Sequence, residues 1–240
     1  MGGMTTSASG IASGGFQNTS GGGTQDAFLV KFNVAGNRLW ATYYGGTGGD
    51  YCSGLATDAS GNVYLGGYTE STTGIASGGF DNIYGGGFYD AFLLKFNASG
   101  ARQWATYYGG AGGEYGYGID TDASGNVYLG GHTESASGIA SGGFQNTYGG
   151  GILDAYLVKF NAAGVRQWAT YYGGTGQDES WSISTDASGN VYLGGHTEST
   201  SGIASGGFQN IYGGGTFDAF LAKFNSSGVR QWATYYGGAN

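Results

Sequence analysis

The chain has 240 residues, of which 55 are glycine and none is proline, and its formal net charge is −8 at pH 7. Collagen is excluded because proline and a Gly-X-Y period are both missing, and a disulfide scaffold is excluded because Cys52 is the single cysteine. The acidic balance and the even dispersal of the eight Lys and Arg residues argue against nucleic acid as a partner, and no apolar run is long enough for insertion into a membrane as a helix.

The first predicted elements form a hairpin. Phe28, Val30 and Phe32 alternate with the residues between them in the period-two pattern of a strand. Asn33–Gly36 then predicts a turn, because Asn and Gly readily adopt the positive φ values of tight hairpins. Arg38–Tyr44 completes the pair as the second strand.

A second hairpin follows. Ser53–Thr57 and Val63–Thr69 are predicted strands, joined by the turn Asp58–Asn62. The glycine-rich stretch from about Glu70 to Tyr89 recurs almost unchanged along the chain, which predicts an ordered loop. No segment carries the apolar stripe of a helix, so the fold class is all-β.

These elements repeat with a period of 64 residues. The period is visible in the spacing of Trp40, Trp104, Trp168 and Trp232, and it gives 3.75 copies in 240 residues. Tandem four-stranded antiparallel units are typical of a β-propeller. We expect a single repeat array of about 3.5 blades, with a half-blade over 1–48 and blades over 49–112, 113–176 and 177–240. The first unit is expected to contribute two strands, which makes 14 in all.

The stretch Asp122–Ser135 resembles the bacterial SBBP β-propeller repeat. It carries the pattern Asp-x-x-Gly-Asn-x-Tyr-x-x-Gly-x-Thr-x-Ser, and Asp-Ala-Phe-Leu-x-Lys-Phe and Tyr-Tyr-Gly-Gly elements of the same repeat occur elsewhere in the chain. One departure is the absence of the usual Phe-Pro after this pattern. The resemblance implies a non-enzymatic module of a secreted or surface-attached bacterial protein. Met1–Met4 has no signal-peptide character, so we expect a removed leader or a piece of a longer chain.

The incomplete first unit predicts self-association. In repeats of this kind the strand that begins each unit is expected nearest the central axis, so the first blade would lack its inner half. Exposed strand edges and apolar faces favour association. Other copies of the chain are therefore the expected partners, in a closed homo-oligomer or in an open filament.

Several motifs suggest metal binding but have simpler explanations. Gly45–Asp50 matches the start of a calcium-binding nonapeptide, yet it recurs every 64 residues rather than in direct tandem. Asp58, Ser60 and Asn62 have the opening spacing of an EF-hand without its later ligands. His132 and His196 share one repeat position and have no cysteine or third histidine to complete a site. We expect that Gly45–Asp50 forms a crossover between blades, that Asp58–Asn62 forms a hairpin turn, and that the two histidines are structural residues. We therefore expect no metal and no cofactor.

Internal divergence between the units predicts a binding rim. The framework strands hardly change, whereas the inner strand exchanges aromatic, acidic and small side chains. Packing would not permit such freedom, so these positions are expected at one mouth of the central channel or at exposed sites under drift. The candidate ligand-binding residues are Tyr51, Tyr115, Tyr117, Asp120, Glu179 and Trp181.

The sequence thus predicts a structural or self-assembling module whose rim binds a carbohydrate or a surface protein. Aromatic rings beside carboxylates suit sugars, which present apolar faces and hydroxyls together. The alternative from a different class is a glycosidase or lyase in the channel, with Asp120 and Glu179 as the carboxylate pair. A third alternative is an engineered repeat protein without a natural ligand, because the units are nearly identical.

Overall fold

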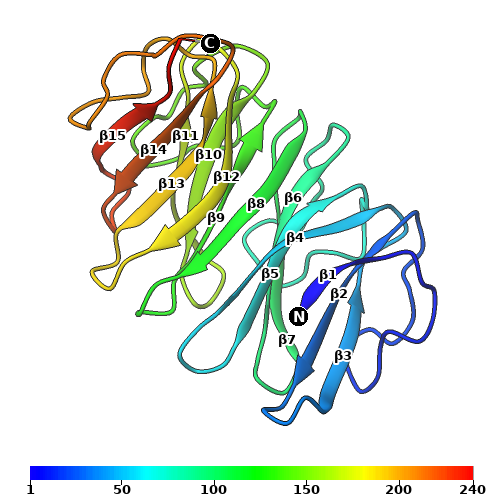
Figure 1. Ribbon diagram of the computed structural model, residues 1–240. Helices are drawn as coiled ribbons and strands as arrows, with labels where there is room; N and C mark the ends of the chain where they lie inside the picture. Colours follow the sequence, from blue (N-terminus) through cyan, green and yellow to red (C-terminus); the bar gives the residue numbers. More distant parts are fainter. Residues whose placement is uncertain (240) are drawn as a thin grey trace.

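The computed structural model describes residues 1–239, which form 15 strands and no helix (Figure 1). The first sheet contains β1 (Gly2–Thr5), β2 (Asp26–Phe32) and β3 (Arg38–Tyr44). The second contains β4 (Asp50–Thr57), β5 (Val63–Thr69), β6 (Asp90–Phe96) and β7 (Arg102–Tyr108). The third contains β8 (Glu114–Thr121), β9 (Val127–Thr133), β10 (Asp154–Phe160) and β11 (Arg166–Tyr172). The fourth contains β12 (Asp178–Thr185), β13 (Val191–Thr197), β14 (Asp218–Phe224) and β15 (Arg230–Tyr236).

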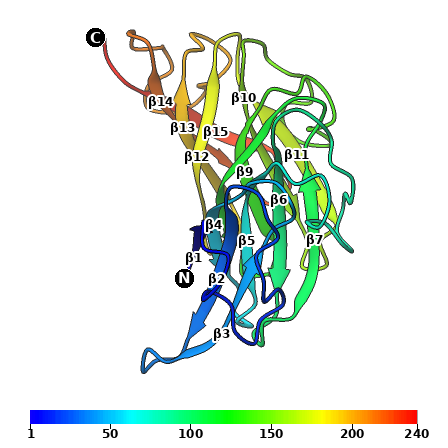
Figure 2. The same ribbon diagram turned by 90° about the vertical axis from the view of Figure 1, so that its right-hand side faces the viewer.

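The four sheets are successive propeller blades, so the predicted fold class is confirmed. We call them blades 1 to 4 in chain order. Within each blade the strands are antiparallel and follow sequence order. The inner strand β8 packs against both β4 and β12, which confirms that the strand opening each unit lies innermost. The array is open, with blade 1 and blade 4 at opposite ends and the two termini far apart (Figures 1 and 2).

The predicted count of 14 strands is wrong, because blade 1 has three strands rather than two. Gly2–Thr5 pairs antiparallel with β2, and Gly2 lies opposite Leu29. Met1 continues the ladder, since its carbonyl accepts a hydrogen bond of 2.8 Å from the Val30 amide. The segment Met1–Thr5 corresponds to the end of β9, and these few residues are enough to add a strand. Blade 1 therefore lacks only the inner strand.

The hydrophobic core lies between the blades. Three clusters of buried side chains each combine residues of two neighbouring blades. Trp104 and Tyr108 of blade 2, for example, pack with Tyr156 and Phe160 of blade 3. β6 and β10 are buried along their whole length, because both of their faces contact another blade. Trp40, Trp104 and Trp168 and most of the paired tyrosines are therefore core residues.

Each inter-blade contact depends on a glycine in the hairpin turn of the following blade. Gly164 has a φ of +79°, and a Cβ at this position would lie 2.7 Å from Cδ2 of Trp104. The glycine is required both for its backbone conformation and for the close approach of the indole ring.

We expect Gly164→Ala to destabilise the chain by about 3 kcal/mol, from backbone strain together with overpacking against the indole. Gly125→Ala is the matched control. Its φ is +76°, but its Cβ would make only an ordinary contact of 3.9 Å with Ala162. This control should lose about 1 kcal/mol. Urea unfolding of both variants measures the difference, and equal losses would contradict the role given to the tryptophan contact.

Candidate functional site

Five of the six candidate rim residues lie near the beginning of the inner strands. Tyr51 is on β4, Tyr115 and Tyr117 are on β8, and Glu179 and Trp181 are on β12. Because the inner strands of successive blades run side by side, these five side chains lie at the same end of the inner strands. The sequence predicted this grouping from the divergence of the repeats.

Asp120 is the sixth candidate, and the structure separates it from the others. It occupies the repeat position of Ser184, five residues along β12 from Glu179, which corresponds to roughly 16 Å in a strand. Its carboxylate accepts hydrogen bonds from the Thr185 amide at 2.6 Å and the Thr185 hydroxyl at 2.9 Å. Asp120 therefore links β8 to β12. Glycosidase carboxylates lie about 5–9.5 Å apart, so Asp120 and Glu179 do not form the predicted catalytic pair.

The rim contains a continuous band of aromatic rings that crosses blades 2, 3 and 4. The spacing between ring centroids is 4.8 Å from Tyr51 to Tyr68, 5.2 Å from Tyr68 to Tyr115 and 4.6 Å from Tyr117 to Trp181. Trp181 is 45% exposed, and most of the other rings are half-buried. We call the following set the aromatic band: Tyr51, Tyr68, Tyr89, Tyr115, Tyr117, His132, Trp181, His196 and Phe217.

Sequence reasoning missed three members of the aromatic band, Tyr68, Tyr89 and Phe217, and put His132 and His196 aside as structural residues. The signal was present in the strand register. Tyr51 lies opposite Tyr68, and Tyr115 lies opposite His132. The variable inner-strand position and the variable strand-end position are therefore cross-strand neighbours, and such pairs interact directly.

Glu179 is the acidic centre of the aromatic band. Its carboxylate lies 3.6 Å from Nδ1 of His132 in blade 3 and 3.5 Å from Nε2 of His196 in blade 4. Burial lowers the pKa of His132 to about 4, although the charge of Glu179 opposes this shift. The His132 imidazole is therefore neutral at neutral pH.

His196 lies between Trp181 and Glu179. Trp181 Nε1 donates a hydrogen bond of 3.2 Å to Nδ1 of His196, and Nε2 of the same ring faces Glu179. No group of three or more His, Cys, Asp or Glu side chains within residues 1–239 is arranged to hold a metal ion.

The two calcium-like motifs are structural turns. The Asp50 carboxylate, at the blade 1 to blade 2 crossover, accepts hydrogen bonds from the Gly46 amide at 2.9 Å and the Ser71 hydroxyl at 3.0 Å. Asp58 accepts from the amides of Ser60 and Asn62, both at 3.0 Å. Asp50 thus closes the predicted crossover, and Asp58 closes the predicted hairpin turn.

Each crossover also buries a second carboxyl group, which the sequence analysis did not single out. Asp154 accepts a hydrogen bond of 2.6 Å from the Gly149 amide on one oxygen, while its other oxygen is buried without a partner within residues 1–239. Burial raises the pKa of Asp154 to about 7, and the neighbouring Asp178 adds to this shift. Asp90 has the same environment and a pKa raised by burial to about 7. These groups belong to the fold rather than to the rim.

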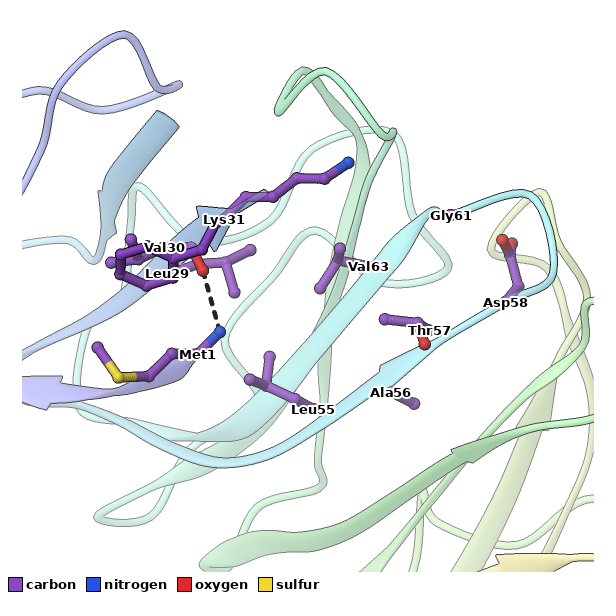
Figure 3. Close-up of a pocket in the computed structure, with 11 residues that line it drawn as sticks. Met1, Leu29, Val30, Lys31, Leu55, Ala56, Thr57, Asp58, Gly61 and Val63 are labelled. Atoms are coloured by element: carbon purple, nitrogen blue, oxygen red, sulfur yellow. Dashed lines mark hydrogen bonds between the residues drawn. The ribbon is translucent and has the colours of Figure 1, made fainter. Parts of the chain in front are cut away.

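A groove of about 540 Å³ lies beside β1, between blades 1 and 2 (Figure 3). β1 begins at Gly2, whereas β9 begins at Val127, three residues earlier in the repeat. The charged groups on its wall already have partners. The Met1 ammonium donates to the Val30 carbonyl at 2.9 Å, Lys31 donates to the Ala98 carbonyl at 2.7 Å, and Asp58 closes its turn. The groove therefore lies beside the short strand of blade 1, and most of its lining side chains are apolar.

Three segments of the chain match the sequence profile of the SBBP family, described as a beta-propeller repeat: residues 39–76, 103–138 and 167–203. The chain therefore carries repeats of this type. It is also similar to the uncharacterized WD repeat-containing protein L264 of Acanthamoeba polyphaga mimivirus, at 23% identity over 93% of this chain. The match covers 19% of that relative's length. These similarities support the repeat type, whereas the bacterial origin that the resemblance implied stays a prediction.

No helix within residues 1–239 is long and apolar enough to span a membrane.

Proposed function

We propose that this chain is a non-enzymatic interaction scaffold of a secreted or cell-surface protein. It associates with copies of itself and binds a ligand along the aromatic band. A role as a scaffold fits both the propeller repeats and the WD-repeat relative. Secretion and surface attachment are inferred from the resemblance of the repeats to those of surface proteins.

The observation that carries the ligand proposal is the continuity of the aromatic band. Its rings follow one another across three blades, and the more exposed members Trp181 and Phe217 lie near Glu179 in blade 4. An elongated row of ring faces beside a carboxylate offers stacking to apolar sugar faces and hydrogen bonds to hydroxyls. A polysaccharide chain fits this arrangement better than a compact ligand, and an extended protein segment is the second candidate.

The geometry does not favour the alternative of a glycosidase or lyase. The only pair of rim carboxylates considered for hydrolysis, Asp120 and Glu179, lies at opposite ends of the inner strands. An engineered repeat protein without a ligand would show no binding in the following test.

Trp181→Ala is expected to weaken binding of a soluble polysaccharide about tenfold, because one stacking contact contributes roughly 1–1.5 kcal/mol. Affinity electrophoresis in gels containing xylan, laminarin, galactomannan or alginate provides the measurement. Ile83→Ala is the control, since Ile83 is exposed but lies outside the aromatic band. The absence of retardation in all four gels would refute a carbohydrate ligand. Equal retardation of Trp181→Ala and the native chain would refute the band as the site.

A further inference from the structure

The chain contains three copies of one inter-blade contact, and each copy uses the same hydrogen bonds. The tryptophan and lysine of one blade donate to a turn carbonyl of the next blade. Between blades 3 and 4, Trp168 Nε1 and Lys159 Nζ each donate to the Ser226 carbonyl at 3.0 Å. The second tyrosine of the pair donates to an isoleucine carbonyl of the next blade, as Tyr172 does to Ile203 at 2.6 Å.

Stacking and apolar packing complete this contact. The guanidinium group of Arg230 in blade 4 lies 4.3 Å from the ring centroid of Phe144 in blade 3. Leu157 of blade 3 and Phe224 of blade 4 are fully buried in the shared core cluster. The same arrangement recurs between blades 1 and 2 and between blades 2 and 3.

Blade 4 presents the donor half of this contact with nothing against it. Leu221 is 39% exposed and Tyr236 is 73% exposed, whereas the equivalent Leu157 and Tyr172 are fully buried. Trp232 Nε1 and the Tyr236 hydroxyl make no hydrogen bond with any residue that the structure describes. The ring of Phe208 is also exposed, at the position where Phe144 stacks on an arginine.

Blade 1 presents the acceptor half. Phe32 is 45% exposed, whereas the equivalent Phe224 is buried. A Cβ on Gly36 would have nothing within 4 Å, although the equivalent Gly228 lies against Trp168. Beside these residues is a groove of about 750 Å³, lined in part by Ile11 and Arg38. The turn carbonyl at the position of Ser226 belongs to Val34, which is fully exposed.

We propose that blade 4 of one copy docks on blade 1 of a second copy through this same contact, and that two copies close into a ring of eight blades. This inference rests on the proposed self-association and specifies its geometry. Across the junction, Trp232 and Lys223 donate to the Val34 carbonyl, Tyr236 donates to the Ile11 carbonyl, and Arg38 stacks on Phe208.

The occupant of each open face is a second copy of the chain. Each face carries the residues that are buried, at the same repeat positions, in the three junctions within one chain. Every donor of blade 4 has an acceptor at the matching position of blade 1. The two faces differ, so the contact is heterologous, and such contacts form rings when the rotation closes. Blade 1 and blade 4 lie at opposite ends of the array, so the two open faces of one chain do not meet each other (Figures 1 and 2). Eight blades from two copies lie within the usual range of propellers.

The test uses two charge substitutions on opposite faces, Leu221→Glu and Phe32→Glu. Both side chains are partly exposed in the single chain, so the variants should fold, which circular dichroism and thermal melting would check. Light scattering after size exclusion should give twice 24.4 kDa for the native chain and 24.4 kDa for each variant. We expect the dissociation constant to rise at least about 100-fold, because each variant buries an unpaired charge. Ile83→Glu, at an exposed site away from both faces, should remain dimeric.

Mixing the two variants distinguishes the proposed pairing from other modes. The Phe32→Glu chain retains an intact blade 4 face and the Leu221→Glu chain retains an intact blade 1 face, so the mixture should restore a complex of two chains with one junction. Failure to restore it, with a native dimer, would overturn the head-to-tail pairing and leave self-association standing. A monomeric native chain would overturn both, and a growing polymer would overturn the closed ring.

Discussion

Lowering the pH from about 8 to about 5 is expected to stabilise this chain by roughly 5 kcal/mol, the opposite of ordinary acid denaturation. The cause is the set of buried carboxyl groups in the crossovers. Burial raises the pKa values of Asp90 and Asp154 to about 7 and that of Asp50 to about 6. Each group holds a proton in the folded chain over a pH range in which the unfolded chain has released it.

The sign follows from proton binding. Between about pH 4 and pH 7 the folded state binds more protons than the unfolded state, so stability falls as the pH rises. A shift of three pKa units corresponds to at most ~4 kcal/mol for one carboxyl, and partial hydration reduces this to about 2 kcal/mol. His132 acts in the opposite direction below about pH 6.5, because burial lowers its pKa to about 4. Three carboxyls outweigh this single imidazole.

Asp154→Asn isolates one of these groups. The amide oxygen can still accept from the Gly149 amide, and the NH₂ group takes the place of the buried oxygen that has no partner within residues 1–239. We expect this variant to be about 2 kcal/mol more stable than the native chain at about pH 8 and equal to it at about pH 4.5. Glu134→Gln removes the same charge at an exposed position and should change neither value by more than ~0.5 kcal/mol.

Urea unfolding at a series of pH values measures both effects. A stability that increases steadily from pH 5 to pH 8 in the native chain would contradict the role given to the buried carboxyl groups. If the Asp154→Asn variant kept the pH dependence of the native chain, Asp154 would not contribute to that dependence.

The sequence was sufficient for the blades because their signals are local and repeated. Period-two alternation and turn residues locate each hairpin, and the 64-residue period counts the units. β1 was missed because its four residues, Gly2–Thr5, have no alternation of their own and form a strand only by pairing with β2. The structure of Gly2–Thr5 is therefore set by its pairing with a strand that lies more than 20 residues away in the sequence.

The rim was predictable in part for a related reason. Divergence between repeats shows which strand varies, but not which end of it faces the mouth. Asp120 was therefore grouped with Tyr115, although the two lie at opposite ends of β8. The burial of the Asp154 carboxyl was beyond prediction, because it depends on contacts between a loop, a crossover and two strands.

The second large effect concerns the tryptophan that joins neighbouring blades. Trp168→Ala is expected to destabilise the chain by about 4 kcal/mol, since it removes a large buried side chain and leaves a cavity. It also leaves the Ser226 carbonyl without the indole donor that lies 3.0 Å away. In a repeat array stability is approximately a sum over units and their nearest-neighbour contacts, so the loss should be concentrated at the junction of blades 3 and 4.

Trp232→Ala is the matched control because it is the same residue in the same repeat position without a following blade. In a Leu221→Glu background, which keeps the chain monomeric, it should cost only about 1 kcal/mol, in proportion to the smaller area that Trp232 buries. Urea unfolding gives the two free energies, and hydrogen exchange should show β13 and β14 opening first in Trp168→Ala. Equal losses at the two positions would mean that the tryptophan stabilises its own blade. The difference between them measures what the tryptophan contributes by packing on the next blade, and the same side chain, Trp232, is available for this contact at the junction between two copies.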